Sequence, residues 1–203
     1  MKIISPFILF VCFIVLVSSS CNYQSRNNNS TIDTLLTKTI IFPNSLLKLN
    51  GVQFQKIDSF LYEIEDKMKI ISIIDAGCME CIMNQLNKID STFNSIMFGD
   101  ESVLIFILNC SREDSIFFMN NLQPAIKAKG TILWDTDFYF EKQNHLFTSS
   151  INSRTFMLNN ENEIIQYGNP ILKPDIIIEY QEKLKINTSG SNEYRKSEAH
   201  GGN

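Results

Sequence analysis

Two cysteines three positions apart, Cys78 and Cys81, are the residues whose type and spacing point most directly to chemistry in this chain. In a Cys-X-X-Cys pair, the thiolate of one cysteine can attack a disulfide, and the second cysteine can then close on the first. The surrounding sequence is Asp75-Ala-Gly-Cys-Met-Glu-Cys. Dithiol–disulfide exchange is therefore the first chemistry to consider.

The segments on either side of the pair indicate how it is positioned. The run Lys69–Ile74 is short, apolar and rich in β-branched residues, which is typical of a buried strand. After the pair, apolar residues recur at intervals of four, three and four, as along one face of a helix: Ile82, Leu86, Ile89 and Phe93. The cysteines are therefore expected where a strand ends and a helix begins. At such a point, free backbone N–H groups and the positive end of the helix dipole stabilise a thiolate.

The start of the chain has the pattern of an export signal. Met1-Lys2 supply a positive start, Ile3–Val17 is apolar, and three serines precede Cys21. The apolar run is too short to favour a membrane-spanning helix. A cysteine after small residues resembles a bacterial lipobox, although such boxes usually carry Leu or Val three positions before the cysteine. We expect residues 1–20 to be a lipoprotein signal peptide and Cys21 to carry lipid; ordinary cleavage and an uncleaved anchor are the alternatives.

The remaining organisation follows from composition. Residues 21–33 are polar without an apolar period and are expected to form a tether, residues 34–186 a folded domain, and residues 187–203 a disordered tail. The formal net charge is -4. Removal of Lys2 with the signal makes the chain one unit more negative. Charges of both signs are interspersed, which gives no electrostatic footprint for nucleic acid. Export would place the cysteines where a disulfide can persist.

The pattern of the domain predicts strands and helices in alternation. A short first strand is expected over Thr39–Phe42, and Ile57–Ile64 has helical or mixed spacing. Beyond the elements that flank the cysteines, the sequence predicts strands over Val103–Leu108, Thr131–Trp134, Arg154–Leu158 and Glu163–Tyr167, a helix capped by Ser111, a short helix from Phe138, and a last helix from Pro174 that carries Ile177, Ile178, Gln181 and Leu184. Helical crossovers followed by a closing hairpin indicate an α/β fold with a mixed central sheet.

These residues resemble the thioredoxin-like superfamily, and specifically its exported TlpA/ResA-like branch of thiol-disulfide oxidoreductases. The resemblance runs from Lys69 to Lys185 and rests on Cys78-Met-Glu-Cys81 after a buried strand, on an extra strand and helix near Thr131–Asn144, and on the segment Thr155–Ile164 before the last helix. It implies a thioredoxin-like fold: a central mixed β-sheet flanked by helices, with the strand–helix insertion of TlpA-like proteins.

The chain departs from that family at three places. Arg154 stands where the family usually has a proline held cis, and a cis bond before a non-proline costs about 2.5 to 4 kcal/mol, so a trans peptide is expected there. Ser72 stands where thioredoxins often carry a buried acid six residues before the first cysteine. The pair Met79-Glu80 differs from the family's Gly-Pro or Pro-His.

The resemblance implies that Cys78 is the nucleophile and that Cys81 resolves the mixed disulfide. Two acids near the pair, Asp75 and Glu80, would raise the pKa of Cys78, whereas a guanidinium at Arg154 would lower it if that loop faces the cysteines. The expected partners are protein thiols or disulfides of the cell envelope, an unidentified membrane electron donor, and the membrane itself through the lipid on Cys21. No cofactor, metal or nucleic acid is expected, and the expected location is the periplasm-facing cell envelope.

Other interpretations of the cysteines stay open. Cys78 and Cys81 could form a permanent structural disulfide in a redox-inactive, thioredoxin-fold binding or accessory lipoprotein. A zinc site built from the pair with Cys110 and His145 is the other chemical class, but the chain lacks the second paired motif that strong zinc patterns bring. Cys110 follows a buried strand and is expected to be a core thiol.

Overall fold

The computed structural model describes residues 35–51, 53–75, 79–97, 99–122, 126–146 and 154–186. The expected signal peptide, tether, lipidated Cys21 and C-terminal tail lie outside these residues, as does Cys78. For Glu80 and Cys81 the backbone is described and the side chain is not. Within the described ranges, no helix combines the length and the apolar character needed to cross a bilayer.

A seven-stranded sheet with the order β2-β1-β5-β4-β3-β6-β7 forms the centre of the domain. The strands are β1 (Leu47–Asn50), β2 (Gln53–Lys56), β3 (Met68–Asp75), β4 (Ser102–Asn109), β5 (Thr131–Asp135), β6 (Thr155–Leu158) and β7 (Ile164–Tyr167). The central strands β3, β4 and β5 are parallel, and the outer strands on both sides pair antiparallel. The expected α/β fold class with a mixed central sheet is therefore confirmed.

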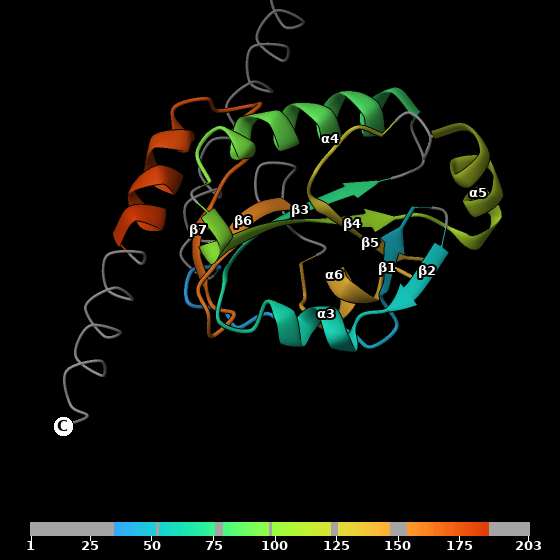
Figure 1. The fold of residues 1–203 in the computed structure, drawn as a ribbon, viewed down its shortest axis with the longest axis horizontal. Coiled ribbons are helices and arrows are strands. Elements are labelled where there is room, and N and C mark those ends of the chain that lie inside the picture. The colour runs from blue at the N-terminus through green and yellow to red at the C-terminus, as the bar shows by residue number, and fades with distance from the viewer. Residues whose placement is uncertain are drawn as a thin grey trace, which may run out of the picture. The chain divides into compact units, whose positions relative to one another are not determined.

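Helices lie on both faces of this sheet. They are α3 (Asp58–Glu63), α4 (Met79–Asn94), α5 (Arg112–Phe117) with a π-helical turn over Phe118–Leu122, α6 (Tyr139–Gln143) and a last helix over residues 176–186. A 3-10 turn, Gly99–Glu101, precedes β4. Figure 1 shows α4 over one face of the sheet and α3 and α6 over the other. The strand–helix insertion expected between β4 and β6 is present as β5 and α6.

The two faces are built as the hydrophobic pattern predicted. β3 is buried at every position from Met68 to Ile74 because helices cover both of its faces. The predicted apolar stripe of α4 packs on the sheet, and all four of its residues are almost fully buried: Ile82, Leu86, Ile89 and Phe93. Strand and helix are thus fixed on either side of the cysteine motif.

The N-terminal part of the domain differs from the expectation. Thr39–Phe42 forms no strand; Thr39 makes a single bridge to Glu163. The first strand is β1, and it turns into β2 with Asn50 opposite Gln53. Gly51 adopts φ +60 at that turn, a conformation that glycine reaches without strain. Asn-Gly is the strongest short-range hairpin signal, so Asn50-Gly51 marks the first hairpin better than the apolar run in Thr39–Phe42 marks a strand.

The predicted last helix is present over residues 176–186. Ile176, Tyr180 and Leu184, at intervals of four, are buried, while Ile178 is exposed. The Tyr180 hydroxyl donates to the backbone oxygens of Thr155 and Gly168, at 3.2 and 3.1 Å. Burial raises the pKa of Tyr180 well above its usual value. This helix therefore anchors the start of β6 and the end of β7.

Candidate functional site

Three polar residues end the three parallel strands side by side. Asp75 ends β3, Asn109 ends β4 and Asp135 ends β5, and the register pairs Asp75 with Asn109 and Asn109 with Asp135. In open α/β sheets, ligands bind outside the carboxyl ends of such strands. The same edge leads from β3 toward the cysteine motif, which makes it the candidate site.

The cysteine motif lies between two elements that the structure describes. β3 ends at Asp75 and the described part of α4 begins at Met79, so Cys78 comes one position before the first described helical residue and Cys81 two positions after it. The predicted junction of strand and helix is therefore present in the backbone. The roles predicted for Cys78, Cys81 and Glu80 stay predictions, because their side chains lie outside the described part of the chain.

Arg154 lies against the end of β3 and connects it to α6. Its Nη2 atom donates to Asp75 Oδ1 at 2.9 Å, and Nη1 donates to Asp75 Oδ2. On its other side, Nε and Nη2 donate to Glu141 Oε1 and Oε2 at 3.1 and 2.8 Å. The guanidinium thus makes paired hydrogen bonds with two carboxylates, the strongest geometry for such ion pairs. We call Asp75, Arg154, Glu141 and Asn109 the strand-end network.

Asn109 completes this network from β4. Its amide nitrogen donates to Glu141 Oε2 at 2.6 Å and to Asp75 Oδ1 at 3.3 Å. Because both neighbours are acceptors, the orientation of the amide is determined by them. Asn109 and Glu141 are buried, and Asn109 Oδ1 has no hydrogen-bond partner among the described residues. The network therefore reaches from the solvent-exposed Asp75 into the interior.

The charges of the network shift each other's proton affinity. The hydrogen bond from Arg154 lowers the pKa of Asp75, against the opposing effect of partial burial. Burial alone would lower the pKa of Arg154, but the hydrogen bonds to Asp75 and Glu141 outweigh it and raise that pKa. Arg154 is therefore a permanent cation whose charge is bound by carboxylates.

Asp135 positions Glu141 by capping α6. Its Oδ1 and Oδ2 accept hydrogen bonds from the backbone N–H groups of Tyr139 and Phe140, at 3.0 and 2.8 Å. Phe138 enters the helix in a left-handed conformation, with φ 57. Asp135 therefore caps the start of α6. Glu141 itself was not predicted, since α6 has five residues and no apolar period can be read from so short a helix.

A neutral hydroxyl pair occupies the other face of β3. Ser72 Oγ and Thr155 Oγ1 lie 3.1 Å apart, both are buried, and the two residues are register partners between β3 and β6. Ser72 and Asp75 are three positions apart in the strand, so their side chains point to opposite faces of the sheet. Ser72 points to the face covered by α4. Thioredoxins often carry a buried acid at the position of Ser72. In this chain the position holds a hydroxyl, which is hydrogen-bonded to the hydroxyl of Thr155.

Cys110 is a free thiol in the core, as expected. It is 2% exposed and packs in the cluster between the sheet and α4. Burial, with a smaller contribution from Asp114, raises its pKa to about 11. Such a thiol is almost wholly protonated at neutral pH and is unreactive.

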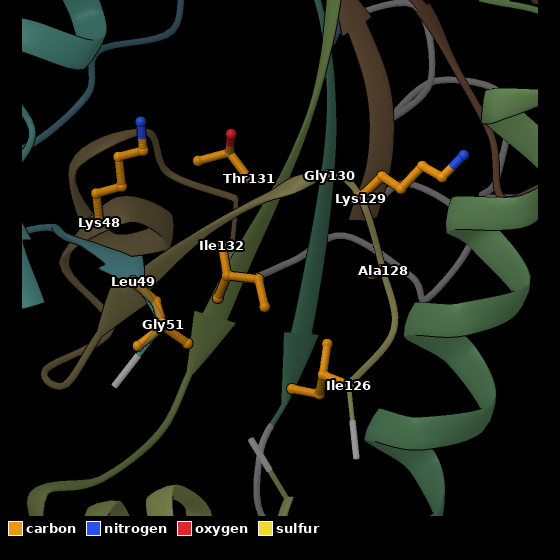
Figure 2. A pocket seen from close by; sticks show the side chains of 9 residues that line it. All are labelled: Lys48, Leu49, Gly51, Ile126, Ala128, Lys129, Gly130, Thr131 and Ile132. Atoms are coloured by element: carbon orange, nitrogen blue, oxygen red, sulfur yellow. The ribbon is translucent and has the colours of Figure 1, made fainter. Parts of the chain in front are cut away.

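A hollow of about 250 Å³ lies at the opposite end of β5 from this network. Lys48, Gly51, Lys129 and Thr131 are among its lining residues. Figure 2 shows the side chains of Lys48 and Thr131 rising on one side, while Lys129 points away from them. Because it lies at the other end of β5, the hollow is separate from the candidate site.

Among the described residues, no group of three His, Cys, Asp or Glu side chains is placed to hold a metal ion.

Comparison with known proteins gives structural likeness at low identity. The chain matches no protein-family model. No curated protein sequence matches it. An uncharacterized thioredoxin-like protein from Porphyromonas gingivalis is 15% identical, with 70% of this chain and 90% of that chain covered and a TM-score of 0.48. The exposed lipoprotein thioredoxin Etrx1 from Streptococcus pneumoniae is 15% identical, with 69% and 100% covered and a TM-score of 0.48. StoA from Bacillus subtilis is 15% identical, with 63% and 89% covered and a TM-score of 0.41.

Proposed function

We propose that this chain is a thiol-disulfide oxidoreductase of the cell envelope, held to the membrane by lipid on Cys21 and acting through Cys78 and Cys81. The observation that carries the proposal is the backbone on both sides of the motif. A buried parallel strand ends at Asp75 and a helix of 16 residues begins at Met79. A cysteine directly before such a helix meets the free N–H groups and positive dipole end that stabilise a thiolate.

The proposed reaction is a two-step exchange of sulfur–sulfur bonds. The Cys78 thiolate attacks one sulfur of a substrate disulfide, forms a mixed disulfide and expels the other substrate sulfur as a thiolate. Cys81, after losing its proton to solvent, attacks the Cys78 sulfur and expels the second substrate thiolate. The two electrons that reduce the substrate disulfide come from the Cys78 and Cys81 thiols, which end as a disulfide. Oxidation of a substrate dithiol is the same sequence in reverse.

A second candidate function follows from the face of β3 toward α4. The neutral Ser72–Thr155 pair supplies no carboxylate there to accept a proton. This favours a redox-inactive, thioredoxin-fold binding or accessory lipoprotein in which Cys78 and Cys81 form a structural disulfide. The two candidates differ in whether the disulfide exchanges with other thiols.

Reduction of insulin separates them. The chain with its export signal removed, the Cys78→Ser variant and the Cys110→Ser variant would be compared in the presence of dithiothreitol. We expect turnover by the parent chain and by Cys110→Ser, and none by Cys78→Ser. Absence of turnover by a folded parent chain would leave the binding role.

A further inference from the structure

The strand-end network joins three segments that are far apart in the sequence. Asp75 comes three residues before Cys78, Glu141 belongs to α6, and Arg154 directly precedes β6. The side chains of Asp75, Arg154 and Glu141 are 56%, 17% and 3% exposed. Arg154 is hydrogen-bonded to both carboxylates at once and so links Glu141 to Asp75.

The network carries more negative than positive charge. Two carboxylates, Asp75 and Glu141, face one guanidinium, and Asn109 contributes neutral N–H groups to both. Asp135 lies at the neighbouring strand end, where two backbone N–H groups at the start of α6 hold its charge. The positive charge of Arg154 therefore neutralises one of the two carboxylates, and the network keeps a net charge of one negative unit.

The leftover charge lies within reach of the cysteine pair by chain length alone. Three residues span at most about 11 Å when fully extended, so the Cα of Cys78 is no farther than that from the Cα of Asp75. The Debye length at physiological ionic strength is about 8 Å, but partly buried charges such as those of Arg154 and Glu141 are screened much less than exposed ones, so the charge of the network can act over this range. A negative charge at this range disfavours a thiolate and hence the reduced state of a dithiol.

We infer that Glu141 is a positioning residue for the proposed exchange: through Arg154 it holds Asp75 in place, and its charge keeps the strand-end network negative. The cysteine pair is then a better electron donor than it would be with a neutral network. This inference rests on the proposed function and names the direction of transfer, from Cys78 and Cys81 to the disulfide of another envelope protein. From the sequence, a guanidinium at Arg154 was expected to lower the pKa of Cys78 if its loop faces the cysteines; in the structure its charge is bound by Asp75 and Glu141.

Four variants separate the charge of Glu141 from its shape. Glu141→Gln keeps the size of the side chain and an oxygen that accepts from Arg154, but removes the charge. Glu141→Asp keeps the charge. Asp75→Asn removes the charge at the exposed end of the network, where a loss of folding is not expected. Glu161→Gln, in the exposed turn between β6 and β7, is the matched control for losing one negative charge elsewhere.

The measurement is the equilibrium constant of the Cys78–Cys81 couple with glutathione, on the chain with its export signal removed. We expect Glu141→Gln and Asp75→Asn to favour the reduced dithiol by about threefold to tenfold, a tenfold change being about 30 mV for this two-electron couple. Iodoacetamide reactivity should show a lower pKa of Cys78 in both variants. Glu161→Gln should match the parent chain, and Glu141→Asp, which keeps the charge on a shorter side chain, should lie closer to the parent chain than Glu141→Gln does.

Each outcome bears on the inference in one direction. Equal constants for Glu141→Gln and Glu161→Gln, with a parent pair that exchanges normally, would overturn it and leave the proposed function standing. A parent pair that does not exchange with glutathione would overturn both. Should Glu141→Gln fail to fold by circular dichroism, Asp75→Asn decides: a shift toward the reduced dithiol supports the inference, and an unchanged constant contradicts it.

Discussion

Arg154 and Asp75, 79 positions apart in the sequence, form a two-point ion pair at the carboxyl end of β3. The pair bridges the segment before the cysteine motif and the segment before β6, and Glu141 and Asn109 continue it into the interior. A charged network of this kind at the edge of a sheet has consequences for stability as well as for chemistry. Both can be measured independently.

Replacing Arg154 with Met should destabilise the domain. The variant leaves the buried Glu141 carboxylate without its cation, and removal of one partner from a buried pair costs about 3 kcal/mol or more. Urea unfolding followed by circular dichroism gives the free energy of unfolding. Lys173→Met, at an exposed lysine before the last helix, is the control and should change it by less than about 0.5 kcal/mol. Equal effects of the two substitutions would mean that the ion pairs contribute nothing to stability.

Asp75 should make the stability of the domain depend on acid pH. Its pKa is lower in the folded chain than in the unfolded chain because Arg154 binds the charged form. Such a group stabilises the fold above its unfolded pKa of about 3.9, and this contribution is lost as the pH falls through the folded value. The difference in unfolding free energy between the parent chain and Asp75→Asn should therefore be constant from pH 5 to 7 and shrink below about pH 4. A difference independent of pH down to pH 2 would contradict the ion pair.

Asp90 should be needed to hold the segment before β5 against α4. Its Oδ1 accepts the backbone N–H groups of Lys129 and Gly130, at 2.9 and 2.8 Å. Asp90→Ala leaves two donors without their acceptor and should cost about 1 to 3 kcal/mol, whereas Asp90→Asn keeps an accepting oxygen and should cost less. Thermal and urea unfolding of both variants tests this. An alanine variant no less stable than the asparagine variant would show that the contact is dispensable.

Cys110 should be inert in the folded chain. Its pKa of about 11 and its burial leave almost no accessible thiolate at pH 8. In the reduced protein, iodoacetamide should modify Cys110 only after addition of urea, as read by mass spectrometry of peptides. Modification of Cys110 in the native protein at the rate of Cys78 would contradict its place in the core.

Periodicity predicted the elements on either side of the motif well. The short continuous apolar run of β3 and the four-three-four spacing of α4 arise from burial against the same core, so local pattern and tertiary packing agree. Ser111 caps α5 as expected, with its Oγ accepting from the Asp114 N–H at 3.2 Å. In each of these places the sequence pattern reflects a single physical cause, either burial or helix capping, and can therefore be read from the sequence.

The strand-end network was beyond prediction from the sequence. The sequence named Arg154 as a charge that would act on Cys78 if its loop faces the cysteines, but nothing in the local sequence shows that Glu141 in a five-residue helix would contact it. That contact depends on the register of β3, β4 and β5 and on the capping of α6 by Asp135. Ion pairs across a sheet edge are set by tertiary geometry, which periodicity does not record.

The measurement that tests the central claim most directly is the reduction potential of the Cys78–Cys81 couple. We expect a reversible two-electron couple between about -270 and -120 mV, the range of catalytic dithiols, and nearer its negative end because of the network's charge. The Cys110→Ser variant should give the same value. A potential below about -300 mV, with slow reduction by glutathione, would contradict the claim and make the disulfide structural.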